Sequence, residues 1–150
     1  MTALPPQETA SRQTWMAILA RASAAELEPV AACLAACTRL RGPEVGLVMV
    51  EGRAGGTGAA FNLGEATVAR CSVQDGAGRV GHAYRLGRDL RAAELSASLD
   101  AALQDPAQHA DLWRDVIEPL GAAQAAARAR TARQAAATHV QFFTMATMRS

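Results

Sequence analysis

Alanine dominates the apolar residues of this chain and limits the kind of core that it can build. Half of its 150 residues are hydrophobic, yet 36 are alanine and aromatic residues make up only 4%. An alanine buries less apolar surface than a leucine or a phenylalanine, so each buried position contributes less free energy. The length and the 19% of charged residues fit one globular domain over residues 1–150, with a loose start at residues 1–10. We therefore expect a single domain with a thin core.

The charges of the chain are nearly balanced, with 15 basic and 14 acidic residues and a net charge of +1. Such a balance gives no field that would draw the chain to nucleic acid or to a membrane surface. Every basic residue is arginine, which excludes a Schiff-base lysine and the lysine of a P-loop. No basic segment followed by an apolar run opens the sequence, and no run of about 18 apolar residues follows. The sequence predicts a cytoplasmic protein with neither a nucleic-acid nor a membrane partner.

Two helices are expected near the N-terminus. Apolar residues including Trp15 recur at helical spacing over residues 11–22. Ser23 has Glu26 three positions later, which is the pattern of a capping box that satisfies free amide groups at the start of a helix. The second helix should therefore begin at once, and Pro29 should bend it or end it early.

Strand signals replace the helical ones after Ala36. The segment "RGPE", residues 41–44, has the composition of a turn between a short extended piece and a strand over residues 45–53. This pattern predicts the first hairpin of the sheet.

The clearest hairpin follows further along the chain. A strand over residues 67–73 leads into "QDGAGR", residues 74–79, in which Asp75 and Gly76 form a strong tight-turn pair. Apolar and polar residues then alternate over residues 79–86, as expected of a return strand with two different faces.

Helices are expected again in the last third of the chain. Asp89 is a candidate N-cap for a helix with leucines at four-residue steps that ends before Pro106. A short helix over residues 111–118 and a long alanine-rich one over residues 121–138 precede an apolar terminus at residues 140–145. The whole pattern predicts an α+β fold, an antiparallel β-meander flanked by N-terminal helices and C-terminal helices.

A glycine cluster between the strands is the first candidate for a functional site. Consecutive amide groups can cradle a phosphate, and the cluster provides such groups at Gly55, Gly56, Thr57 and Gly58. The cluster lacks the Lys-Ser/Thr ending of a P-loop, and a strand follows it instead of a helix. Taken alone, this pattern favours a tight connection over a phosphate site.

Several arginines fall in or beside the expected sheet. Their forked donors suit a phosphate or a carboxylate, so they form a second candidate site: Arg53, Arg70, Arg85 and Arg88. The alternative is that they pair with acidic side chains on a solvated face. Both interpretations remain open at this level.

Cysteine and histidine residues give no metal pattern. Cys33 and Cys37 lie four residues apart on an expected helix, but no second pair of ligands is evident, and Cys71 stands alone on a strand. No nucleophile stands beside a base in a recognised pattern. We therefore expect no metal site, and reduced cysteines rather than a disulfide framework.

Four segments occur in an order that goes beyond composition. They are "SRQTWMAILA" (11–20), "GLVMVEGRAGGTGAAFNLGEATVAR" (46–70), "GHAYRLGRD" (81–89) and "HVQFFTM" (139–145). In this order the chain resembles the G subunit of the bacterial carbon-phosphorus lyase system, the PhnG family, over nearly its whole length.

This resemblance implies a subunit of the α-D-ribose 1-methylphosphonate 5-triphosphate synthase within the carbon-phosphorus lyase complex. That complex displaces adenine from MgATP with an alkylphosphonate, and the H, I, J and L subunits are the implied partners. The resemblance implies an assembly or allosteric subunit that binds no cofactor by itself, with the chemistry mainly in the I subunit. MgATP would be a substrate of the complex.

Together with the resemblance, the residues indicate two kinds of candidate site, one for contact with substrate or partner and one for partner docking. The candidates for contact with substrate or partner are Arg53, Gly55, Gly56, Thr57, Gly58, Arg70, Arg88 and Asp89, and those for partner docking are Trp15, Phe142, Phe143 and Met145. Two alternatives stay open. One is a self-sufficient nucleotide-binding transferase that uses the glycine cluster, and the other is an unrelated self-associating scaffold.

Overall fold

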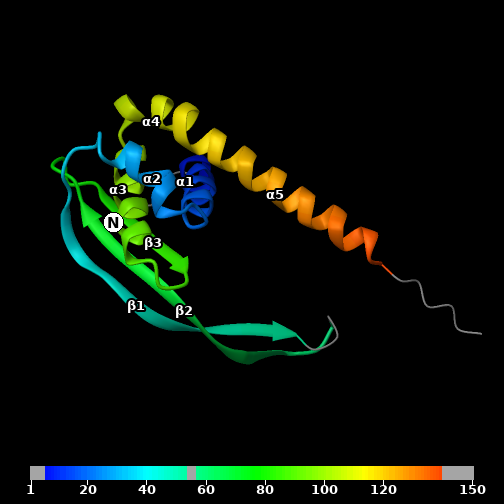
Figure 1. The fold of residues 1–150 in the computed structure, drawn as a ribbon. Coiled ribbons are helices and arrows are strands. Elements are labelled where there is room, and N and C mark those ends of the chain that lie inside the picture. Colours follow the sequence, from blue (N-terminus) through cyan, green and yellow to red (C-terminus); the bar gives the residue numbers. More distant parts are fainter. Residues whose placement is uncertain (1–5, 54–56, 140–150) are drawn as a thin grey trace, which may run out of the picture.

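The computed structural model describes residues 6–53 and 57–139, and these form one sheet and a set of helices (Figure 1). In chain order the elements are α1 (Pro6–Leu19), α2 (Ala24–Ala31), β1 (Thr38–Arg53), β2 (Ala60–Gln74), β3 (Val80–Leu86), α3 (Leu90–Leu103), α4 (Pro106–Leu112), the π-helical η1 (Trp113–Ile117) and α5 (Glu118–Ala137).

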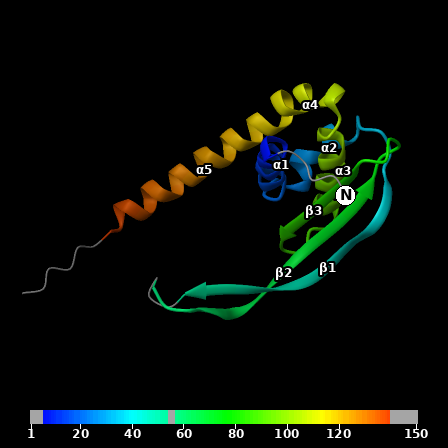
Figure 2. The ribbon, with the colours of Figure 1, turned by 180° about the vertical axis from the view of Figure 1, so that it is seen from behind.

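The sheet is an antiparallel meander in the order β1-β2-β3, as predicted, with helices before and after it. The α+β fold class is therefore confirmed. Helix α3 lies across one face of the sheet, and α1 and α2 pack on the far side of α3 (Figures 1 and 2). The opposite face carries none of the described helices. The two faces of the sheet therefore meet different surroundings.

The turn predicted at residues 41–44 is wrong, because these residues belong to strand β1. The pairing with β2 shifts register on either side of Arg41, and Gly42 has a φ of +66° there. A bulge of this kind bends a strand without ending it. Pro43 is tolerated because β1 is an edge strand, where a missing N–H breaks no ladder of hydrogen bonds. The first hairpin is instead the one that joins β1 to β2 across residues 54–59.

The N-terminal helices differ from expectation in their bounds. Helix α1 begins at Pro6 and ends at Leu19, so it includes residues 6–10, which the sequence had assigned to the start of the chain before the helix. Proline is well suited to the first helical position, where its missing N–H would be unpaired anyway. The capping box of α2 is confirmed, since the Ser23 hydroxyl accepts from the Glu26 N–H and the Glu26 carboxylate accepts from the Ser23 N–H. Helix α2 ends two residues after Pro29.

The two helices predicted after Pro106 are one continuous run. Helix α4 begins with Pro106, and the Asp105 side chain accepts from the N–H of Ala107 as its N-cap. The five π-helical residues of η1 then lead directly into α5 at Glu118. The prediction of a separate helix over 111–118 missed this Asp-Pro start signal. It also missed that η1 carries the chain forward without a break.

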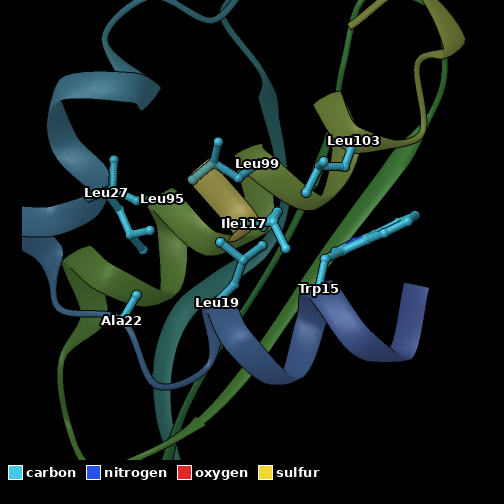
Figure 3. Packing of buried hydrophobic residues seen from close by; sticks show 8 residues of the cluster. All are labelled: Trp15, Leu19, Ala22, Leu27, Leu95, Leu99, Leu103 and Ile117. Carbon is cyan, nitrogen blue, oxygen red and sulfur yellow. The ribbon is translucent and has the colours of Figure 1, made fainter. Parts of the chain in front are cut away.

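The core has two parts of different composition. Between the helices lies a cluster of mostly large side chains (Figure 3), namely Trp15, Leu19, Ala22, Leu27, Leu95, Leu99, Leu103 and Ile117. Between α3 and the sheet lie small residues, namely Ala69, Cys71, Val73, Ala83, Ala93, Ala97 and Ala101. Alanine is therefore used where α3 approaches the sheet closely, and leucine where the helices meet one another.

Glycine at position 81 is required for this close approach. A β-carbon at Gly81 would collide with the carbonyl oxygen of Ala97 and the backbone nitrogen of Ala101. Ala83 and Arg85 share this buried face of β3, whereas Tyr84 and Leu86 lie on the opposite face. The larger apolar residues of β3 are thus on the side that no described helix covers.

Candidate functional site

A buried carboxylate joins the helices to the sheet and was not anticipated from the sequence. Asp100 is fully buried and accepts from the indole Nε1 of Trp15 at 2.8 Å, from the N–H of His82 at 2.8 Å and from Arg12 Nη2 at 2.7 Å. A buried charge is tolerable only when it is paired and hydrogen-bonded in this way. The signal in the sequence was weak, because Asp100 stands alone among apolar residues of a helix. Its contacts are structural.

Arg85 is a second buried polar residue, and it has no acidic partner among the described residues. Its Nη2 donates to the carbonyl of Ala22 at 2.6 Å, and its Nη1 lies 3.4 Å from the Ser96 hydroxyl. Burial lowers the pKa of Arg85 from its ordinary value. Because Nη1 also reaches the carbonyl of Leu19, the guanidinium serves the end of α1, where free carbonyls favour a cation. It does not face solvent.

The glycine cluster forms the connection at the tip of the β1–β2 hairpin. The Nη1 of Arg53 donates to the carbonyl of Gly58 at 3.1 Å, which closes the connection across its base. Arg53 and Thr57 are exposed. Gly55 and Gly56 lie outside the described residues. The cluster joins two strands, as the sequence predicted, and the structure leaves any role in binding phosphate as a proposal.

The arginines expected near the sheet do not converge. The Nε of Arg70 lies 2.8 Å from Glu44 Oε1, on the face opposite to buried Arg85. The same Glu44 oxygen accepts from Arg41 at 2.6 Å, and that hydrogen bond, with Arg70 as a weaker contributor, lowers the pKa of Glu44. Arg70 is therefore already engaged with an acidic side chain.

The second candidate site, Arg88 with Asp89, lies away from the tip of the hairpin. The Asp89 carboxylate accepts from the N–H of Ala92 at 2.8 Å and caps α3, as predicted, while Arg88 is exposed beside it. Arg88 lies two residues after Leu86, which pairs with Val68 of β2. Arg53 pairs with Ala60, which lies eight residues earlier in the same strand. Eight residues of strand span about 26 Å. The structure does not bring the two candidate sites together.

Trp15 is corrected from a docking candidate to a core residue, because only 5% of its surface is exposed. Its ring packs edge-on against His109 and its nitrogen is bonded to Asp100. The other docking candidates, Phe142, Phe143 and Met145, lie outside the described residues.

A pocket of about 170 Å³ lies near the second hairpin, between Cys37, Ser98 and Gln108. Arg79, the one cation among the described residues that line the pocket, forms ion pairs with Asp75 at 2.6 Å and with Asp105 at 3.0 Å. Burial raises the pKa of the Cys37 thiol, which disfavours the nucleophilic thiolate. Across residues 6–53 and 57–139, no three histidine, cysteine or acidic side chains gather as metal ligands would.

Five of the exposed large apolar residues in the described part of the chain lie on the hairpin arm, which we define as residues 47–53 of β1 with residues 60–67 of β2. This arm continues past the end of β3, beyond the reach of α3 (Figures 1 and 2). Its exposed apolar residues are Leu47, Met49, Val50, Phe61 and Leu63, with Tyr84 and Leu86 nearby on β3. Surfaces of this kind mark sites of protein contact. The sequence signal was the presence of apolar residues at consecutive positions 47–50, which serve both faces of one strand.

Helix α5 is the second projecting feature. The Gln124 side chain donates to the carbonyl of Ile18 at 3.0 Å, and every described residue from 125 onward is exposed. The helix leaves the other helices as a single rod (Figure 1). None of the helices in the described ranges combines the length and hydrophobicity needed to cross a bilayer.

The fold and its two projections define a class of protein, a helix-backed antiparallel sheet that offers apolar and alanine-rich surfaces for contact with other chains. The comparison with known families is more specific. A family described as "Phosphonate metabolism protein PhnG" matches residues 10–148. The chain is 43% identical over 139 residues to the α-D-ribose 1-methylphosphonate 5-triphosphate synthase subunit PhnG of Rhizobium meliloti (strain 1021), covering 91% of this chain and 88% of that protein. The chain belongs to the PhnG family.

Proposed function

We propose that this chain is the G-type subunit of an α-D-ribose 1-methylphosphonate 5-triphosphate synthase. The observation that carries the proposal is the 43% identity to a synthase subunit across 91% of the chain. The exposed apolar arm supports it, because a subunit must offer surface to other chains. The complex would displace adenine from MgATP with an alkylphosphonate in the cytoplasm, and this chain would assemble with H, I, J and L subunits without binding a cofactor alone.

The role of this chain in that complex is assembly or allosteric control, with the chemistry housed mainly in the I subunit. The alternative of a self-sufficient transferase needs several cations around the glycine cluster. Arg70 is instead paired with Glu44, and Arg85 is buried on the other face of the sheet. Of the three arginines, Arg53 is the one that contacts the glycine cluster.

Co-expression tests this proposal. The chain should co-purify with the H, I and J subunits, and adenine should be released from MgATP and methylphosphonate only when those subunits are present. Adenine release by the isolated chain would favour the self-sufficient transferase. A stable homo-oligomer that joins none of the subunits would favour the scaffold.

Substitution of Arg53 tests the tip of the arm. Arg53→Ala should lower adenine release by the assembled complex about tenfold or more, because a hydrogen bond to a charged group is worth about 1.5–3 kcal/mol. Assembly yield should change far less. Arg21→Ala is the matched control, since Arg21 is exposed and donates only locally, to the carbonyl of Ala17. Equal rates of adenine release for Arg53→Ala and the wild type would show that the tip of the arm does not contribute to the synthase site.

A further inference from the structure

Among the described residues, no strand pairs with the outer backbone edge of β2 along the hairpin arm, which we call the free edge. Strand β3 pairs with β2 only from Val68 to Gln74, and the carbonyl of Thr67 accepts from the N–H of Gly87 at 2.9 Å just beyond that ladder. From Ala60 to Ala66, β2 has β1 on one side and no described strand on the other. Backbone groups alternate sides along a strand, so Glu65, two residues before Thr67, directs its N–H and carbonyl to the free side.

The outer edges of β3 and β1 are protected over part of their length. On the outer edge of β3, the N–H of His82 donates to Asp100 at 2.8 Å, and the carbonyl of Val80 accepts from Arg12 at 3.1 Å and from Gln104 at 2.9 Å. The outer edge of β1 is interrupted by the bulge that contains Pro43. Bulges, prolines and covering side chains are the usual means of preventing unwanted strand pairing. The free edge of β2 has an irregularity of its own, because the pairing with β1 shifts register between Gly64 and Asn62, but this edge has no proline and one charged residue, Glu65.

Apolar side chains border this free edge. Phe61 and Leu63 are 48% and 62% exposed, and Leu86 at the end of β3 is 75% exposed. The side chain of Leu63 extends over Gly52, the cross-strand partner of Phe61, so Leu63 and Phe61 lie on the same face of the arm. A strand laid along the edge would bury these side chains and satisfy the backbone groups together. This is the combination found in recognition by strand addition.

We propose that a sister subunit of the synthase inserts an extended segment along residues 60–66 of β2, in line with β3. Alternate residues of that segment are apolar and cover Leu63 and Leu86. The inference rests on the proposed function, because it takes the partner to be another chain of the same complex.

A second copy of this chain fits the edge poorly. If two copies paired through residues 60–66 about a two-fold axis, residues 58 and 59 of one copy would lie opposite residues 68 and 67 of the other. Those positions are already occupied by Leu86 and Gly87. A segment from a different chain, free to end before β3, avoids this collision.

Hydrogen exchange on the full chain, alone and in the co-expressed complex, tests the proposal. Those amides of residues 60–67 that face away from β1 should exchange about tenfold more slowly or better in the complex, whereas amides of β3 should change little. Leu63→Lys and Leu86→Lys should each reduce co-purification about tenfold or more, because each places a charge in the contact. Leu40→Lys is the matched control, since Leu40 is 53% exposed at the other end of β1.

The possible results separate the two proposals. Failure of the wild-type chain to join any sister subunit overturns the proposed function and this inference with it. Assembly without added protection of residues 60–67, or with wild-type yields of both lysine variants, overturns the strand addition alone. Protection in the isolated chain of those amides of residues 60–67 that face away from β1 overturns it too. If that protection depends on concentration, the occupant is a second copy, and if it is lost on deleting residues 140–150, the occupant is the chain's own C-terminal segment.

Discussion

Two buried polar residues hold the helices to the sheet at the residue scale. Asp100 and Arg85 come from α3 and β3, and neither pairs with the other. Asp100 binds side chains of α1 together with the edge of β3, while Arg85 binds carbonyls at the end of α1. The hydrogen bonds of each residue stabilise the fold, because removing its partners would leave a buried charge that water cannot solvate. They orient α1, whose leucine and tryptophan side chains complete the helical core.

Replacing Asp100 with asparagine tests this role. Asp100→Asn should lower the free energy of unfolding by about 3–5 kcal/mol, because Arg12 loses its buried counter-charge and the amide cannot accept from all the donors around it. Urea unfolding followed by circular dichroism measures the change. Asp111→Asn is the control, as Asp111 is 70% exposed where it pairs with Arg114, and should change stability by less than about 1 kcal/mol. Equal losses in the two variants would contradict the role assigned to Asp100.

At the scale of elements, the contact between α3 and the sheet depends on small residues. Gly81→Ala should lower the free energy of unfolding by about 1–3 kcal/mol, since the added methyl would meet the backbone of α3 and force it away. Thermal or urea unfolding measures the loss. Gly76→Ala is the matched control, because a β-carbon at Gly76, in the turn between β2 and β3, would meet nothing within 4 Å. A Gly81→Ala protein as stable as its control would show that α3 can shift without loss.

The start of α2 carries a pH dependence. Hydrogen bonds from the backbone and then the side chain of Ser23 lower the pKa of Glu26 below its ordinary value of 4.5. A lowered pKa in the folded state contributes stability that is present above 4.5 and is lost as the pH falls through the folded value. The stability gap between the wild type and Glu26→Ala should therefore be widest near neutral pH and close at acid pH. Urea unfolding at several pH values measures it, and a gap independent of pH would contradict the assignment.

On the scale of the whole molecule, the arm and α5 extend beyond the body that contains both parts of the core. The part of α5 beyond Gln124, residues 125–137, is short enough that as an isolated helix it would be marginal in water even though it is rich in alanine. The body gains little from α5 beyond Gln124, because every described residue after it is exposed. Both projections therefore fit a chain completed by its partners.

Deletion of residues 126–150 tests the whole-molecule view. The free energy of unfolding should change by less than about 0.5 kcal/mol, because the removed residues that the structure describes bury nothing in the body. Co-purification with the sister subunits should be lost. Urea unfolding of the truncated chain and pull-down from co-expression provide the two measurements. Wild-type assembly of the truncated chain would remove α5 and the terminus from the docking surface.

Local signals in the sequence were sufficient for much of the fold. The capping box at Ser23, the Asp75-Gly76 turn and the N-cap at Asp89 each act within a few residues, so each could be recognised from neighbouring positions alone. The segment at residues 41–44 was misread for the same reason. A turn and an edge bulge use the same glycine and proline, and only the pairing with β2 distinguishes them.

What the sequence by itself determined is the order of the elements, the antiparallel meander and the family, because these depend on short-range patterns and on motifs in sequence. What only the tertiary structure decided is which surface remains open. Because β3 is shorter than β2, the outer edge of β2 along the arm has no described partner strand, and the close contact of α3 with Gly81 decides which face of the sheet is buried. Burial is a property of residues far apart in the chain, so no local pattern could have separated exposed Leu86 from buried Leu99.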